Sequence, residues 1–298
     1  MRHFIALLAC LCLVRAGPVM GQGAGVSLDH PIQSDSATKM SLGMVPQFRT
    51  QNKFGETDNL DAAATDIWDG STAEIVAISG TIIWVPPNAA RIHALVSSSL
   101  ADSDSGGANP QSTGMRTVEV CGLETWTSTS ATTETVILDG TTAVNTVNSY
   151  VIIYRMTGLA WGSGGVNAGS ITADAAVDGT TTAAITIGNN QTQMLIYGIS
   201  STMKLRVDNF RSSLIKTSGA NLRATGKVLW MADPAANAAA NTAWVNKESF
   251  ELTTDDSWIR PYSPPKKFDG PGIIKLQLVG SGNDIDAIAT FDATIKDD

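Results

Sequence analysis

Apolar and polar residues alternate along most of this chain. The segments Met115–Cys121 and Thr133–Leu138 alternate with a period of two, which predicts strands with one buried and one solvated face. Ser149–Met156 is more continuously apolar, as is typical of a central strand. Asp139 and Gly140, a pair that favours hairpin turns, stand between the last two segments, so we predict a hairpin there.

Further strands are expected wherever β-branched residues lie between turn residues. These are Glu74–Val85, Arg91–Ser99, Ala183–Ile187, Gln193–Ile199, Lys204–Ile215, Asn221–Met231, Lys247–Leu252, Gly272–Gly280 and Asp284–Ile295. The one helix expected is Asp233–Trp244, with Asp233 as its N-cap and Pro234 in the first helical position. Three prolines (Pro261, Pro264 and Pro265) are expected in a connection between strands. The pattern predicts an all-β fold made of one or two antiparallel β-sandwich, jelly-roll-like modules.

The first 21 residues have the composition of a secretory signal peptide. They combine a basic start, an apolar run from Phe4 to Val14 and small residues before a possible cleavage site. The apolar run is too short to span a bilayer, so no membrane contact is expected of the mature protein. The alternative is an extension from a wrongly assigned start codon, with Met20 or Met40 as the true start.

The remaining chain divides into three parts by composition. Residues 22–72 are polar and irregular and predict an extended N-terminal arm. Residues 73–169 are expected to form a first β-sandwich module, and residues 170–298 a second one, because 298 residues exceed a typical single domain.

A glycine-rich segment closes the predicted first module. Gly158–Gly169 holds five glycines, which allow a backbone to bend sharply or to approach another backbone closely. We predict a hinge or a contact between subunits in this segment, formed by Trp161, Gly164, Gly165, Asn167 and Gly169.

Composition narrows the possible partners. The formal net charge is -8 and the isoelectric point is near 4.8, which disfavours general binding to phosphate backbones, so no nucleic acid partner is expected. A hydrophobic content of 43% with 16% charged residues is that of a folded protein with a core.

The residues that could perform chemistry are few and scattered. His3 and His30 lie in the leader and the arm, and His93 lies in a predicted strand as a structural residue. Cys121 is isolated in the body, so no zinc site or disulfide framework is expected. Asp102 and Asp104 imitate half of a calcium loop, but the distal glutamate is missing. We therefore predict no catalytic residue, no metal and no cofactor.

Seven tryptophans leave two interpretations open. Aromatic faces can stack on sugar rings, but the more common role of tryptophan is burial in a core or an interface. They are Trp68, Trp84, Trp126, Trp161, Trp230, Trp244 and Trp258, and they show no repeat spacing.

A set of short motifs resembles a family of virion structural proteins of marine tailed bacteriophages. In order, the motifs are Asn52-Lys53-Phe54-Gly55, Asp66-Ile67-Trp68-Asp69-Gly70, Arg116 to Val120 with Gly122-Leu123, Glu134 to Val136, Asp139 to Val144, Gly165 to Gly169, and Gly188 to Thr192. The resemblance implies a non-enzymatic component of the virion that contacts other copies of itself and other virion proteins. It transfers no binding residue, because the shared motifs are turns and strands.

Two other functions stay open at this point. A secreted β-sandwich adhesin or glycan-binding module would explain the leader and the tryptophans. A glycan hydrolase would need a pair of carboxylates in a cleft, for which Asp255-Asp256 and Asp284 with Asp286 are the candidates.

Overall fold

The computed structural model describes residues 48–58, 60, 62–78, 80–104, 107–216, 222–238, 243–254, 257–282 and 285–297. The predicted signal peptide and the first half of the predicted arm, up to residue 47, lie outside these residues. The elements are β1 (Phe48–Thr57), β2 (Ala64–Asp66), η1 (Asp69–Ser71), α2 (Ala73–Val76), β3 (His93–Ser97), β4 (Met115–Leu123), β5 (Thr132–Ile137), β6 (Val144–Asn145), β7 (Ile152–Trp161), β8 (Ile171–Ala175), β9 (Thr180–Ile185), β10 (Ile196–Ile199), β11 (Met203–Lys216), β12 (Arg223–Ala232), α3 (Pro234–Asn237), β13 (Trp244–Thr253), β14 (Ser257–Asp269), β15 (Gly272–Gly280) and β16 (Ile285–Asp297). The fold is all-β, as the sequence predicts.

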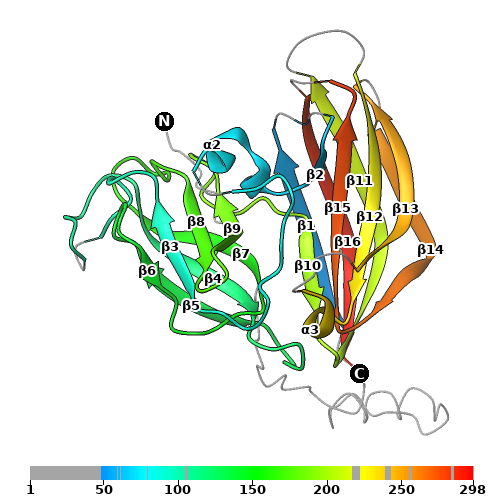
Figure 1. The fold of residues 1–298 in the computed structure, drawn as a ribbon, viewed down its shortest axis with the longest axis horizontal. Helices are drawn as coiled ribbons and strands as arrows, with labels where there is room; N and C mark the ends of the chain where they lie inside the picture. Colours follow the sequence, from blue (N-terminus) through cyan, green and yellow to red (C-terminus); the bar gives the residue numbers. More distant parts are fainter. Residues whose placement is uncertain are drawn as a thin grey trace, which may run out of the picture.

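The longer strands form a two-layer antiparallel sandwich on the right of Figure 1. One sheet has the order β1-β16-β11-β14, and the other has the order β10-β15-β12-β13 with β2 also paired to β15. Alternate residues of β11 and β16, such as Leu205, Val207, Phe291 and Ala293, are buried between the two sheets. This sandwich is one of two units.

The pairings within the sandwich run from the ends of the chain inward. The first strand, β1, pairs with the last, β16; β2 and β10 pair with β15; β11 pairs with β14; and β12 pairs with β13. Two further pairings, β11 with β16 and β12 with β15, join these pairs into sheets. The sandwich is therefore one long antiparallel ribbon wound on itself.

The second unit is inserted between β2 and β10. It holds the sheets β6-β3-β8-β9 and β5-β4-β7, drawn in cyan and green in Figure 1. β2 pairs with Gln277–Val279 and β10 pairs with Gly272–Lys275, which are consecutive parts of β15. The inserted unit therefore begins and ends beside the same strand. We call residues 67–195 the inserted unit.

Side chains from both units share one core where the units meet. Lys53 of β1 is buried and donates a hydrogen bond from Nζ to the carbonyl oxygen of Tyr154 in β7, at 2.7 Å. The ring of Tyr154 stacks on that of Tyr197 in β10, with ring centroids 4.6 Å apart. The guanidinium of Arg155 lies 5.1 Å from the ring centroid of Phe54. Cationic and aromatic contacts thus fix the inserted unit to the edge of the sandwich.

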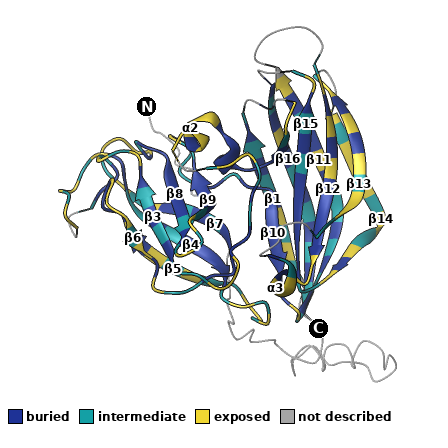
Figure 2. Ribbon diagram, in the orientation of Figure 1, coloured by how far each residue is buried: buried dark blue, intermediate teal, exposed yellow. Residues whose placement is uncertain are grey.

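The prolines placed in a connection by the sequence pattern lie instead in strand β14. This strand is at the edge of its sheet and is exposed on most positions, as the yellow of β14 in Figure 2 shows. Proline lacks the N–H group that a central strand needs, but an edge strand tolerates it. The register between β11 and β14 breaks between Val207 and Asn209, opposite the segment that holds Pro264 and Pro265.

Two local predictions are wrong because tertiary contacts override the local pattern. Glu74–Val85 was expected as a strand, but it contains the end of α2 followed by irregular backbone. Asp139 and Gly140 do not make a hairpin between adjacent strands, because β4 lies between β5 and β7. The turn instead connects to β6, which pairs with β3 in the other sheet.

The division of the chain also differs from the one that composition suggested. β1, within the expected arm of residues 22–72, is a full strand of the sandwich. β8 pairs with β3 and β9 pairs with β8, so one sheet crosses the boundary expected between residues 169 and 170. Within the described residues, the expected helix Asp233–Trp244 contains the single turn α3, Trp244 begins β13, and Asp233 makes no capping hydrogen bond through its side chain.

Candidate functional site

The glycine-rich segment predicted as a hinge or subunit contact follows β7 and is fixed by a pair of asparagines. Asn167 is buried and its Oδ1 accepts a hydrogen bond from the N–H of Asn190 at 2.9 Å, while its own N–H donates to Asn190 Oδ1 at 3.0 Å. Nδ2 of Asn167 donates to the carbonyl oxygens of Gly169 and Thr186, at 2.8 Å and 2.9 Å. The segment is thereby held against the loop between β9 and β10.

Trp161 is the last residue of β7 and is partly exposed. Its indole Nε1 donates to Asn190 Oδ1 at 2.9 Å, and its ring covers Gly158. Leu159 is 48% exposed, Trp161 36% and Val166 41%, so three apolar side chains reach solvent close together in sequence. Exposed apolar side chains on a fixed scaffold are typical of a contact surface, and the subunit contact stays a prediction.

The three predicted glycines meet different local needs. Gly165 has φ of +72°, a left-handed conformation that favours glycine. A Cβ on Gly169 would lie 2.6 Å from the backbone nitrogen of Ser99, so the backbones approach too closely for a side chain. The N–H of Gly164 donates to the carbonyl oxygen of Thr113 at 2.8 Å.

A buried carboxylate, Asp102, joins this segment to two strands. Its Oδ1 accepts from the N–H groups of Met115 and Ala168, at 2.7 Å and 2.8 Å. Its Oδ2 accepts from Ser97 Oγ at 2.6 Å and from the N–H of Gly169 at 2.8 Å. Four donors replace the water that a buried carboxylate loses, so Asp102 serves the structure. These contacts favour a rigid surface over a hinge.

The carboxylate oxygens of the partial calcium motif accept hydrogen bonds from groups of the protein itself. Both oxygens of Asp102 are engaged as above, Asp104 Oδ1 accepts from Gln111 Nε2 at 2.7 Å, and Gly106 lies outside the described residues. Among the residues that the structure describes, no group of three or more His, Cys, Asp and Glu side chains is placed to hold a metal ion.

His93 and Cys121 are both buried. Burial lowers the pKa of the His93 imidazole to about 4, so the ring is neutral at physiological pH. Neither ring nitrogen has a hydrogen-bond partner within the described chain, and Tyr150 lies beside the ring with centroids 6.2 Å apart. The sequence interpretation of His93 as a structural residue agrees with this setting. The acid pairs Asp255-Asp256 and Asp284 with Asp286 have members outside the described residues.

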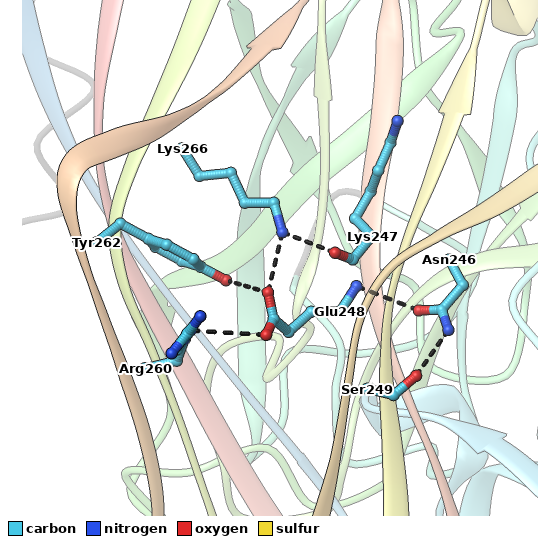
Figure 3. Close-up of polar contacts among 7 residues, drawn as sticks. All are labelled: Asn246, Lys247, Glu248, Ser249, Arg260, Tyr262 and Lys266. Atoms are coloured by element: carbon cyan, nitrogen blue, oxygen red, sulfur yellow. Dashed lines mark hydrogen bonds and ion pairs between the residues drawn. The ribbon is translucent and has the colours of Figure 1, made fainter.

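A polar cluster that the sequence did not suggest closes the open edge of the sandwich (Figure 3). Glu248 of β13 accepts hydrogen bonds from Lys266 Nζ at 3.0 Å and Tyr262 Oη at 3.1 Å, and Arg260 Nε lies 3.5 Å from it. Nζ of Lys266 also donates to the carbonyl oxygen of Lys247 at 2.7 Å. Behind the cluster, Phe250 and Trp258 stack with centroids 3.8 Å apart. These contacts link β13 to β14, the edge strands of the two sheets.

A buried ion pair between two neighbouring strands of one sheet, β2 and β15, was also missed by sequence reasoning. Lys275 Nζ lies 2.5 Å from Asp66 Oδ2, and both side chains are at most 1% exposed. Asp66 also accepts from Gln277 Nε2 at 3.0 Å and from the N–H of Trp84 at 2.8 Å. Lys275 stands in an alternating apolar strand, and no local signal marks its partner more than two hundred residues away.

Membrane-spanning segments and known relatives give little further guidance. In the described part of the chain no helix is long and apolar enough to cross a bilayer. No protein-family model matches the chain, and no curated protein matches it in sequence.

Solved structures with weak similarity to this chain include three of infectious bursal disease virus. The Gt strain structure has 10% identity and a TM-score of 0.22, covering 85% of this chain and 72% of that chain. The virus-derived T=1 particles have 10% identity and a TM-score of 0.20, covering 85% and 70%. The Gx strain structure has 8% identity and a TM-score of 0.21, covering 84% and 71%. At such low scores the similarity establishes neither a shared fold nor a shared function.

Proposed function

We propose that the protein is a non-enzymatic structural component of a phage-like virion that assembles in many copies. Head decoration, fibre, neck and tail are the possible positions on the particle. The expected partners are other copies of the chain and other virion proteins.

The strand order of the sandwich carries the proposal. The pairing of β1 with β16, β2 and β10 with β15, β11 with β14, and β12 with β13 agrees with the winding of a jelly roll and so supports the proposal. Jelly rolls recur in viral capsid proteins and in lectins because the winding closes two sheets over one core. The ordered motifs that resemble virion proteins of marine phages point to the first of these two uses.

Two further observations support a role in assembly. The Leu159, Trp161 and Val166 side chains are exposed on a segment that Asn167 holds rigid, which suits a repeated contact between copies. His93 has no exposed surface, so a substrate cannot reach its ring as a general base.

Purified particles provide the direct test. Mass spectrometry of density-gradient particles should detect this chain at a fixed, high copy number, and immunogold electron microscopy should place it on one part of the particle. A protein found only in the medium, and never in particles, would refute the proposal.

A secreted lectin-like adhesin is the second candidate, because jelly rolls also serve lectins and Trp161 is partly exposed. N-terminal sequencing of the mature protein separates the two, since cleavage near Gly21 supports secretion and an intact Met1, Met20 or Met40 start opposes it. Glycan-array binding that is lost in Trp161→Ala and retained in Trp258→Phe would favour the adhesin.

A further inference from the structure

Bases stand side by side on the outward face of the sheet β1-β16-β11-β14. Lys204 of β11 is directly opposite Lys296 of β16, and Arg206 of β11 is directly opposite Lys267 of β14. Leu205 between them is fully buried, so positions 204 and 206 point together to the outward face. We call Lys204, Arg206, Lys267 and Lys296 the basic cluster.

This arrangement opposes folding unless something compensates for it. Like charges directly opposite each other on neighbouring strands repel. The cluster contains two such pairs, at two successive outward-facing positions of β11, Lys204 and Arg206. The acids near the cluster on this face are Asp269, opposite Lys204, and Asp292, which lies 3.9 Å from Arg211, so bases remain in excess there. The Nε atom of Arg206 is buried with no hydrogen-bond partner among the described residues. In a chain of net charge -8, this local excess indicates a binding site for an anionic surface.

The inserted unit of the same chain has the complementary charge. Residues 67–195 contain ten acids, three arginines and no lysine, a net charge of -7. Asp69, Asp102 and Asp139 among them are buried, whereas Glu74 is exposed and Glu119 and Glu124 are partly exposed. Each copy of the chain therefore has a basic cluster on one unit and an excess of acids over bases in the other.

We propose that the basic cluster of one copy docks on the acidic inserted unit of a second copy. The two surfaces differ, so the contact is heterologous and joins copies head to tail, which produces rings or extended arrays according to the angle between copies. Opposed charges across such a contact set its register and speed its formation. This inference rests on the proposed role in a multi-copy particle and adds which surfaces meet.

Sedimentation velocity of the purified full chain tests the contact. Self-association should weaken at least about tenfold between about 50 mM and about 500 mM NaCl, because salt screens exposed charges. The variant Lys267→Glu/Lys296→Glu should associate at least about tenfold more weakly than wild type at low salt. It places acids opposite Arg206 and Lys204, so its melting temperature should be no lower than that of wild type.

The control variant is Lys227→Glu/Lys247→Glu. It changes the net charge by the same amount at two exposed lysines of the other sheet, where Lys227 lies opposite Ser249 and Gln277. Its association should stay within about twofold of wild type. An equal loss in both variants, or association that does not depend on salt, overturns the proposal.

Two further outcomes also overturn it. Wild-type protein that stays monomeric at low salt lacks the contact, even if the chain is found in particles, in which case the proposed function stands without this inference. Binding of a single-stranded DNA oligonucleotide that is lost in Lys267→Glu/Lys296→Glu, without self-association, would assign the basic cluster to a nucleic acid instead.

Discussion

Mild acid should destabilise this protein through His93, and replacing His93 should remove that effect. The folded chain holds the imidazole at a pKa of about 4, against an ordinary value of 6.5 in the unfolded chain. A lowered pKa in the folded state means that the stabilising contribution is complete above pH 6.5 and is lost as the pH falls toward 4. At about pH 5 the unfolded imidazole is almost fully protonated and the folded one is almost neutral, which costs about 2 kcal/mol of unfolding free energy.

Urea denaturation at about pH 7.5 and about pH 5 measures this difference, followed by tryptophan fluorescence. His93→Leu and His93→Gln should each lose about 2 kcal/mol less than wild type between the two conditions. Comparison with wild type cancels the carboxylates, several of which titrate in the opposite direction. His93→Leu should match or exceed the wild-type stability at the higher pH, because it removes two buried nitrogens that have no partner. Equal losses in all three proteins would show that His93 does not titrate as its burial implies.

Three other substitutions test the buried polar contacts. Asp69→Asn should raise the melting temperature at about pH 8 and leave it unchanged near pH 4, because burial raises the pKa of Asp69 well above its usual value and stability is lost as that carboxyl ionises; a gap that is the same at both pH values contradicts this. Lys275→Met should cost about 3–5 kcal/mol in urea denaturation by leaving Asp66 buried without its partner, and Lys275→Met/Asp66→Asn should recover most of the loss. Asn167→Ala should cost about 2–3 kcal/mol and speed proteolysis within residues 162–168. Asn167→Asp keeps the acceptor of the Asn190 N–H but turns a buried carboxylate oxygen toward two carbonyl oxygens, so it should lose at least as much; unchanged cleavage in both would mean that the asparagine pair does not hold the segment.

The hydrogen bonds of Asp102 could not be predicted from the sequence, because their donors come from distant segments. The glycine-rich segment was identified because its composition is local and unusual. Its anchor was not, because Asp102 precedes it by more than sixty residues and sits in what looked like a calcium motif. The structural role of Asp102 can be identified only in the folded chain, where its four hydrogen-bond donors surround the carboxylate.

The sequence by itself determined that the chain is all-β, and it located β4, β11, β12, β15 and β16 to within a few residues. Period-two alternation reports a local property, namely which face of a strand is buried, so it can be read without knowing the partner strand. The structural role expected of His93 followed from its place in a predicted strand, whereas its burial is seen only in the fold.

Only the tertiary structure decided which strands pair. β4 lies between β5 and β7 in their sheet, and β1 pairs with β16, at the other end of the chain. β2 and β10 both pair with β15, although more than a hundred residues separate them in sequence. Each of these choices depends on contacts between distant segments, whose energy no local pattern records. The prolines of β14 follow the same logic, because their position is tolerated at the edge of a sheet and that edge exists only once the sandwich has formed.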